Sequence, residues 1–261
     1  ADGCDGGLEY LRRNTGKRFD PGALCEGARS VIVCGVGYHR PPSAHEVASR
    51  IASYAHSRDY HLTIRERLNE LSAYLRELVP GASGRVFTDT APLAEKSWAV
   101  EAGLGWIGRN SLLANPRLGS FLLLGEVVTT AELESDAPFV RDGCGTCRAC
   151  VDACPVAAIR PDRTIDAGRC ISRRTIEAGD GDEGDLHGWL FGCDVCQRAC
   201  PYNRKAPVSV HDSFAPLAEL ERLDIDDWLG LDEAGFRRIF GETPLARCGL
   251  RRLQERIRRL K

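Results

Sequence analysis

The sequence contains no methionine, and its first residue is alanine. A cytoplasmic chain starts with methionine, so we expect this chain to be a fragment that lacks its natural start. No apolar stretch approaches the roughly 18 residues that a membrane-spanning helix needs. The longest candidate, 120–128, predicts a buried strand instead. We therefore expect no membrane association.

Neither sign of charge is in excess, because 35 Lys and Arg residues face 37 Asp and Glu residues and leave a formal net charge of −2. The whole chain therefore exerts no general attraction on nucleic acid. Its apolar share of 43% and charged share of 28% are ordinary for a globular protein. A secretory signal is also absent, and we expect a cytoplasmic, reducing location.

What the sequence does have is cysteine, 12 residues in all, most of them between positions 144 and 200. The first group runs Cys144-x2-Cys147-x2-Cys150-x3-Cys154-Pro. This is the spacing of bacterial ferredoxins, in which the last cysteine of the run binds the other of two 4Fe–4S clusters. A second group is Cys193, Cys196 and Cys200, again followed by proline, and Cys170 lies between the groups.

We therefore predict two 4Fe–4S clusters and assign four ligands to each. The first cysteine set is Cys144, Cys147, Cys150 and Cys200, and the second cysteine set is Cys154, Cys170, Cys193 and Cys196. Zinc sites also use C-x2-C pairs, but they do not explain the triple spacing or the repeated Cys-Pro ending. Structural disulfides would need an oxidising compartment. We interpret the other cysteines, at 4, 25, 34 and 248, as small buried apolar residues or free thiols.

The organisation along the chain predicts an α/β (α+β) protein in three parts. Residues 1–135 form a first domain, 136–205 a ferredoxin-like cluster module, and 206–261 a helical tail. In the first domain we expect strands at 30–38, 85–88 and 120–129, with glycine in the last marking a bulge or a close approach of backbone. Helical periodicity predicts helices at 44–56, 64–78 and 93–102. A surface loop is expected at 179–185, which is rich in glycine and acidic residues.

The tail carries a strongly basic end. Its apolar residues Leu250, Leu253, Ile257 and Leu260 recur at helical spacing, so one face packs and the other exposes arginines. A solvated basic face is the ordinary explanation. The alternative is a patch that contacts nucleic-acid phosphates.

Two motifs fail on closer inspection. Gly103-x-Gly105-x-x-Gly108 matches the dinucleotide fingerprint in letters, but a predicted helix precedes it and no helix clearly follows. Asp185-x-His187 resembles the start of a cobalamin signature, D-x-H-x-x-G, but position 190 is leucine. We do not expect His187 to ligate cobalt.

Several blocks together resemble the epoxyqueuosine reductase (QueG) family. They are Ile51–His61 with its Arg-Asp-Tyr-His ending, Thr88–Pro92, Ala102–Ser111, Gly119–Glu126, Arg169–Ser172 with Thr175–Glu177, and Gly192–Gln197. The order and spacing of these blocks are more specific than the cysteines alone. The resemblance runs from about residue 6 to the end, and it indicates a short family form, truncated at its amino terminus and without a carboxy-terminal helical-repeat extension.

The resemblance implies a cobalamin in the first domain beside two 4Fe–4S clusters. It implies reduction of the epoxide of epoxyqueuosine to queuosine in a tRNA anticodon loop, the last step of queuosine biosynthesis. Asp89 corresponds to the family's proposed proton donor, and Arg18, Leu113 and Leu124 to cobalamin-contacting positions. In the same light Arg251, Arg252, Arg256, Arg258 and Arg259 become candidates for contact with tRNA.

Removal of an epoxide oxygen takes two electrons and protons, which side chains do not supply. An external low-potential electron donor is therefore expected, and the chain itself is expected to be a monomer. We expect burial beside the macrocycle to raise the pKa of Asp89, so that it holds a proton. Without the resemblance, Asp89 or Thr90 would be interpreted as the N-cap of the next helix.

Two other functions remain open at this point. A reductive dehalogenase-like enzyme would use the same cofactors on a small organohalide and would need no basic tail. A plain 4Fe–4S electron carrier would bind clusters and a partner, but it leaves residues 1–135 unexplained.

Overall fold

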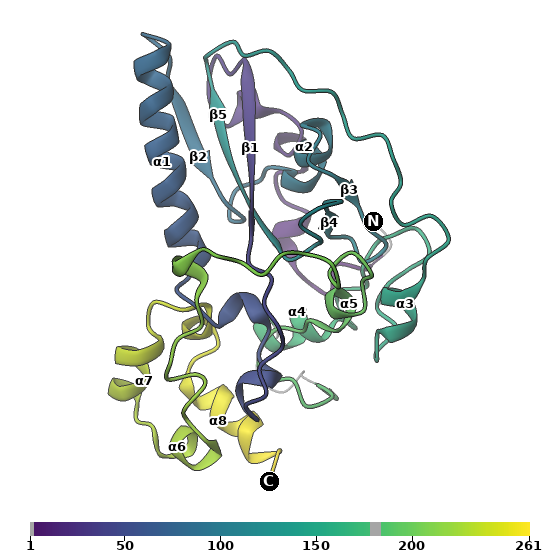
Figure 1. Cartoon of the computed structure of the whole chain (residues 1–261), viewed down its shortest axis with the longest axis vertical. Helices are drawn as coiled ribbons and strands as arrows, with labels where there is room; N and C mark the ends of the chain where they lie inside the picture. The colour runs from purple at the N-terminus through teal and green to yellow at the C-terminus, as the bar shows by residue number, and fades with distance from the viewer. Residues whose placement is uncertain (1–2, 178–183) are drawn as a thin grey trace.

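The computed structural model describes residues 3–177 and 184–261. The predicted surface loop at 179–185 therefore lies largely outside the described residues. Figure 1 shows a sheet flanked by helices, with the last three helices gathered at one end of the molecule. No helix within the described part of the chain is long and apolar enough to cross a membrane.

The central sheet has three antiparallel strands in the order β1-β5-β2. They are β1 (Ser30–Gly37), β2 (Gly84–Phe87) and β5 (Leu122–Thr129), which confirms the three predicted strands. The middle strand, β5, is the most buried. In its register Glu126 lies opposite Val33 of β1 and Phe87 of β2. A charged residue thus occupies the centre of the sheet.

Each face of the sheet is covered by one helix. On one face lies α1 (Tyr60–Leu78), whose N-cap Asp59 accepts a hydrogen bond from the His61 backbone N–H. A Cβ at Gly125 would clash with Ile64 and Leu68 of α1, so the expected close approach at this glycine is confirmed. On the other face lies α2 (Glu95–Glu101), which packs with Leu93 and Trp98 toward Val128. The second and third predicted helices therefore form, with shifted ends.

The predicted helix at 44–56 is wrong. Only two 3-10 turns form there, Ala48–Arg50 and Ser53–Ala55. Ile51 is extended between them, because it forms a bridge with Phe191 and the Ala52 N–H donates to the Phe191 carbonyl. The apolar residues of this segment pack against another part of the chain and do not form one face of a continuous helix.

A small hairpin follows α2. It consists of β3 (Trp106–Ile107) and β4 (Leu113–Ala114). The Gly103–Gly108 motif thus follows helix α2 and contains the short strand β3, and the next element is strand β4 instead of a helix. The dinucleotide interpretation was correctly rejected.

The cluster module and the tail are built from short helices. The module contains α3 (Ala149–Ala153), α4 (Ile171–Ile176) and α5 (Val195–Arg198), and the tail contains α6 (Ile225–Gly230), α7 (Glu233–Phe240) and α8 (Leu250–Arg258). Further 3-10 turns are Glu9–Leu11, Thr15–Lys17, Pro21–Ala23, Asp212–Phe214 and Pro244–Arg247.

The tail does not stand apart from the rest of the molecule. Its largest core packs Trp228, Phe240 and Leu253 of the tail against Ile51 of the first segment and Phe191 of the module. The predicted apolar face of the last helix is confirmed, since Leu250, Leu253 and Ile257 are buried. The predicted boundaries at 135 and 205 stay predictions.

Candidate active site

A cavity of about 420 Å³ lies between the end of the sheet and the cluster module. One side is apolar and includes Leu112, Leu113 and Leu122–Leu124. Tyr60 and Asp89 line it as well. All four residues of the second cysteine set line this same cavity: Cys154, Cys170, Cys193 and Cys196.

The first cysteine set lines a second cavity, of about 550 Å³, next to the first. Its four members, Cys144, Cys147, Cys150 and Cys200, all face this space. Asn110 and Ser120 line both cavities, so the two share a wall. The structure thus gathers the eight cysteines into the two predicted groups.

The thiols of both groups are crowded and partly buried. Burial, together with neighbouring thiols and Asp194, raises the pKa of Cys193 to about 12. Burial and the nearby Cys144 and Cys200 likewise raise the pKa of Cys150. Thiolates packed in this way need a cationic centre to hold them in the charged form, which is what an iron–sulfur cluster provides. Across the described residues, no three His, Cys, Asp or Glu side chains converge closely enough to hold a single metal ion.

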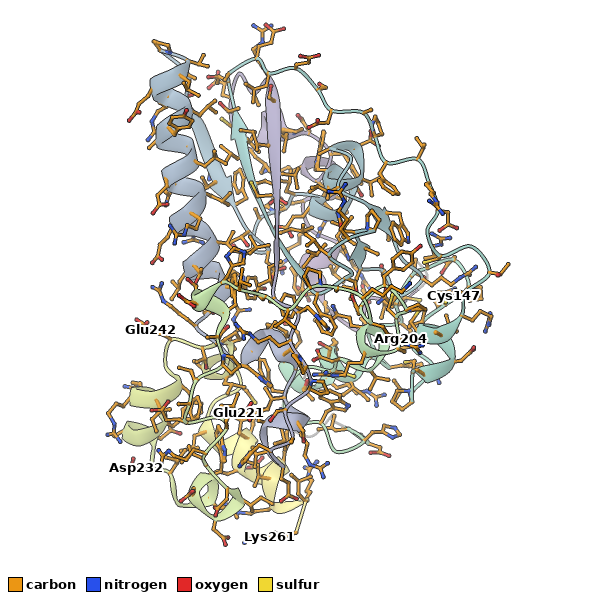
Figure 2. The ribbon with its side chains drawn as sticks, in the orientation of Figure 1. Cys147, Arg204, Glu221, Asp232, Glu242 and Lys261 are labelled. Carbon is orange, nitrogen blue, oxygen red and sulfur yellow. The ribbon has the colours of Figure 1, made fainter. Side chains whose placement is uncertain are left out.

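The first cysteine set lies nearer the surface than the second. Cys147 is exposed, and Figure 2 places it at the outer edge of the molecule, away from the tail residues Glu221 and Lys261. The indole N–H of Trp106 donates to Cys144 Sγ at 3.3 Å. Trp106 in turn packs against Tyr202, with ring centroids 4.8 Å apart. An aromatic group thus covers one cysteine of this set, while another cysteine of the set faces solvent.

Asp89 follows β2 and has φ = 57°, a left-handed conformation that is uncommon outside glycine. Its side chain is 55% exposed toward the cavity. Tyr60 donates its hydroxyl to Asp89 Oδ2 at 2.7 Å, and His61 Nε2 lies 3.3 Å from the same oxygen. Asp89 does not cap α2, whose N-cap residue is Ala94.

His61 links Asp89 to a second carboxylate. Its Nδ1 lies 2.7 Å from Asp59 Oδ1, and Arg247 of the tail lies 3.5 Å from the other oxygen of Asp59. Burial favours neutral imidazole, but the hydrogen bonds to Asp59 and Asp89 outweigh it and raise the His61 pKa. The imidazolium therefore persists to higher pH than in an ordinary histidine.

The expected rise in the pKa of Asp89 is wrong for this structure. Hydrogen bonding to His61 lowers the pKa of Asp89 more than burial raises it, and the bond from Tyr60 lowers it further. The proton of the group is accordingly held on His61, beside an ionised Asp89. The proton-holding group at this site therefore consists of Asp89, His61 and Tyr60 joined by hydrogen bonds, and not of Asp89 alone.

Comparison with known proteins decides the family. Residues 18–90 match the family model for epoxyqueuosine reductase QueG, DUF1730, and residues 143–203 match the model for a 4Fe-4S double cluster binding domain. An epoxyqueuosine reductase of Cyclobacterium marinum is 40% identical over 258 residues, which cover 97% of this chain and 82% of that protein. The chain belongs to the epoxyqueuosine reductase family. Both the predicted family and the prediction of two 4Fe–4S clusters are thereby confirmed.

Solved structures of epoxyqueuosine reductases have the same fold. One contains a tRNA-Tyr epoxyqueuosine-modified stem loop, and it matches with a TM-score of 0.81 and 25% identity over 95% of this chain and 70% of that one. Another, from Bacillus subtilis, has its catalytic aspartate loop swung out of the active site. It matches with a TM-score of 0.80 and 26% identity, again over 95% of this chain and 70% of that one. The α/β fold is thereby confirmed.

The residues that the family resemblance assigned to cobalamin divide in two. Asp89, Leu113 and Leu124 together line the first cavity, which also holds the second cysteine set. Arg18 is not among the described residues that line it; its guanidinium donates to the Tyr10 carbonyl, and its own carbonyl accepts from Trp98 Nε1. The role of each of these residues in binding cofactor stays a prediction. The apolar wall, with Asp89 and Tyr60 at one side and thiols at the other, fits a large flat corrinoid.

The sequence did not indicate a role for Tyr60, His61 or Arg247. The block Arg58-Asp59-Tyr60-His61 supported the family resemblance, but no chemical role was assigned to its members. A Tyr-His pair at the start of a helix gives no sign by itself of its partner, which lies beyond β2. No sequence pattern around Arg247, in the turn Pro244–Arg247, indicated that this residue lies near Asp59.

One predicted tRNA contact is wrong. Arg256 is 2% exposed, and it donates to the Leu190 carbonyl at 2.6 Å. It joins the tail to the module and is inaccessible to a phosphate. Arg251 is exposed but paired with Glu255 at 3.0 Å, and Arg258 is exposed at the end of α8.

Proposed function

We propose that this chain reduces the epoxide of epoxyqueuosine in the anticodon loop of tRNA and yields queuosine. One observation supports this above the others: Asp89 and Tyr60 line one cavity with the second cysteine set, and His61 contacts Asp89. A source of protons and a source of electrons thus meet where a substrate can enter. When bound there, cobalamin would supply the reducing chemistry, with the clusters as one-electron carriers.

The overall reaction consumes two electrons and two protons and releases the epoxide oxygen as water. The chain's own part is to deliver protons to that oxygen. His61 holds a proton near neutral pH and passes it toward Asp89 Oδ2, which it faces at 3.3 Å. Tyr60 fixes the same oxygen through its hydroxyl at 2.7 Å. On the opposite side of the imidazole, Asp59 Oδ1 lies 2.7 Å and Arg247 2.8 Å from Nδ1, and the Asp59 carboxylate favours the charged ring.

The electrons are proposed to enter at the first cysteine set from an external low-potential donor. Its exposed ligand Cys147 gives such a donor access, and the wall shared through Asn110 brings the first set next to the second. The second cysteine set lines the cavity in which we propose that the substrate binds, so its cluster is proposed to be the last carrier before the substrate. Reduction then proceeds from the surface inward.

The tRNA partner is proposed to approach the mouth of the cavity that Asp89 lines, with its modified base turned out of the loop. Two exposed residues remain candidates for phosphate contact: Arg258, the last residue of α8, and Arg259, its C-cap. A contact of that kind weakens steeply as salt rises. We propose that the protein acts in the cytoplasm, where tRNA is modified.

The decisive experiment expresses this chain in bacteria that lack their own epoxyqueuosine reductase. Nucleosides from the tRNA are then analysed by mass spectrometry. We expect epoxyqueuosine to disappear and a nucleoside lighter by one oxygen atom to replace it. Unchanged epoxyqueuosine, with the chain present and its iron content intact, would contradict the proposal.

A further inference from the structure

Glu126 is a buried carboxyl group that the proposed reaction does not use. It lies in the middle strand of the sheet and is 0% exposed. The carboxyl of Glu95 lies within hydrogen-bonding reach of it, and no other described group bonds to its oxygens. An ionised carboxylate is strongly disfavoured in such a buried place beside a second carboxyl, so Glu126 is held in its protonated form.

Glu95, the first residue of α2, connects Glu126 to the Asp89 loop. Glu95 Oε1 accepts a hydrogen bond from the Asp89 backbone N–H. That N–H belongs to the residue with the left-handed φ of 57°. A backbone in this region persists only where surrounding contacts hold it. Glu95, which lines the same cavity, thus holds the backbone of the loop, while Tyr60 and His61 hold the Asp89 side chain.

The two glutamates influence each other's protonation. Burial and the nearby Glu95 charge raise the pKa of Glu126 to about 9, and burial raises the pKa of Glu95 to about 7. The other groups around them are Asp89, the Lys96 ammonium, which donates to the Ser111 carbonyl, and the Cys34 thiol on β1. Between those two values the pair shares one proton.

We propose that Glu95 and Glu126 form a latch that keeps the Asp89 loop in the active site. Protonated Glu126 donates to the Glu95 carboxylate, which thereby stays in place as the acceptor for the Asp89 N–H. Loss of that proton leaves two buried carboxylates side by side, and their repulsion moves Glu95 away from the loop.

The latch rests on the proposed function, because it sets the fraction of time for which Asp89 is in position for the proposed proton transfer. The loop of the Bacillus subtilis relative, which is swung out of its active site, shows that such a loop has a second position. Glu95 and Glu126 are positioning residues that act through Asp89.

Hydrogen–deuterium exchange of the segment 88–94 tests the latch directly. The full chain with its clusters is compared, without tRNA, to Glu126→Leu, Glu126→Gln and the control Glu101→Gln, an exposed carboxyl at the other end of α2. Leucine leaves Glu95 without its donor, and we expect exchange about tenfold faster than in the unmodified chain. Glutamine keeps a donor, so at pH 7 exchange should match the unmodified chain.

Short labelling pulses at pH 9.5 complete the test. The unmodified chain then loses the shared proton and its loop should exchange faster than that of Glu126→Gln at the same pH. Equal exchange in these two proteins at pH 9.5 would overturn the latch, as would protection in Glu126→Leu equal to that in the control. If Glu126→Leu fails to fold, the Glu126→Gln comparison still decides. None of these readouts depends on turnover, so a failed latch is distinguishable from a failed function.

Discussion

The cavity that Asp89 and the second cysteine set line has two sides, which are assembled in different ways. The sulfur side comes from one stretch of chain, 154–196, whose cysteines lie in or beside short helices and turns. The proton side comes from positions far apart, with Tyr60 and His61 at the start of α1, Asp89 after β2, and Arg247 in the tail. Local spacing therefore determines the first side, whereas tertiary packing determines the second. The two sides should respond differently to substitution.

The largest effect is expected on the sulfur side, from Cys196→Ala. This removes one predicted ligand of the cluster nearest the substrate cavity. Electron delivery then stops, so turnover should fall to background and the iron content by roughly half. Iron analysis and a turnover assay measure both effects. Cys34→Ala, a cysteine in β1 outside both sets, is the control and should leave both values unchanged. Full activity in Cys196→Ala would remove that residue from the ligand set.

The next largest effect is expected on the proton side, from Asp89→Asn. The amide occupies the same space but neither carries charge nor relays a proton, so kcat should drop by roughly 10²- to 10⁴-fold. Iron content and affinity for tRNA should stay as they are, because no thiol is altered. Single-turnover kinetics and iron analysis measure this, with exposed Asp136→Asn as the control. Loss of clusters together with activity would show a structural role instead.

The difference between the two sides also explains what could be predicted from the sequence. The eight cysteines were grouped correctly in space because C-x2-C spacing and the Cys-Pro endings constrain local turns. The three strands were found because their runs of Val, Ile and Leu are short and uniformly apolar. The helix expected at 44–56 failed because Ile51 pairs with Phe191, some 140 positions away, and periodicity within a segment carries no information about such a partner.

The same limit applies to single residues. Asp89 was found only through the family resemblance, and its pKa was predicted in the wrong direction. The prediction considered burial alone, whereas the structure places His61 and Tyr60 within hydrogen-bonding reach. Arg256 was taken for a surface residue because it lies in a basic run, but it faces the Leu190 carbonyl inside the molecule. In both cases the missing information was which distant group lies opposite.

A smaller effect, dependent on pH, is expected from His61→Gln. Glutamine can still bond to Asp89 but does not hold the proton, so kcat at pH 6 should fall about 10- to 100-fold. The raised His61 pKa means that the natural site loses its imidazolium only above the ordinary value of about 6.5. The ratio of the two kcat values should therefore shrink as pH rises. A ratio that stays constant from pH 6 to 9 would show that His61 does not supply the proton.

The last prediction concerns stability instead of turnover and follows from Glu126, which lies in β5 next to Glu95. Its folded-state pKa of about 9 exceeds the ordinary glutamate value, so between about pH 4.5 and 9 the folded chain binds more protons than the unfolded chain. The free energy of unfolding contributed by this group must then fall as pH rises through that window, which is opposite to an ordinary paired carboxylate. Glu126→Gln has no proton to lose. The difference between its unfolding free energy and that of the unmodified chain should therefore increase by roughly 5 kcal/mol between pH 5 and 9, at about 1.36 kcal/mol per pH unit. Denaturant unfolding at several pH values measures this, with Glu101→Gln as the matched control on α2. Parallel curves for Glu126→Gln and the unmodified chain would mean that Glu126 is already ionised at neutral pH, and the sheet would then have to be stabilising a buried negative charge.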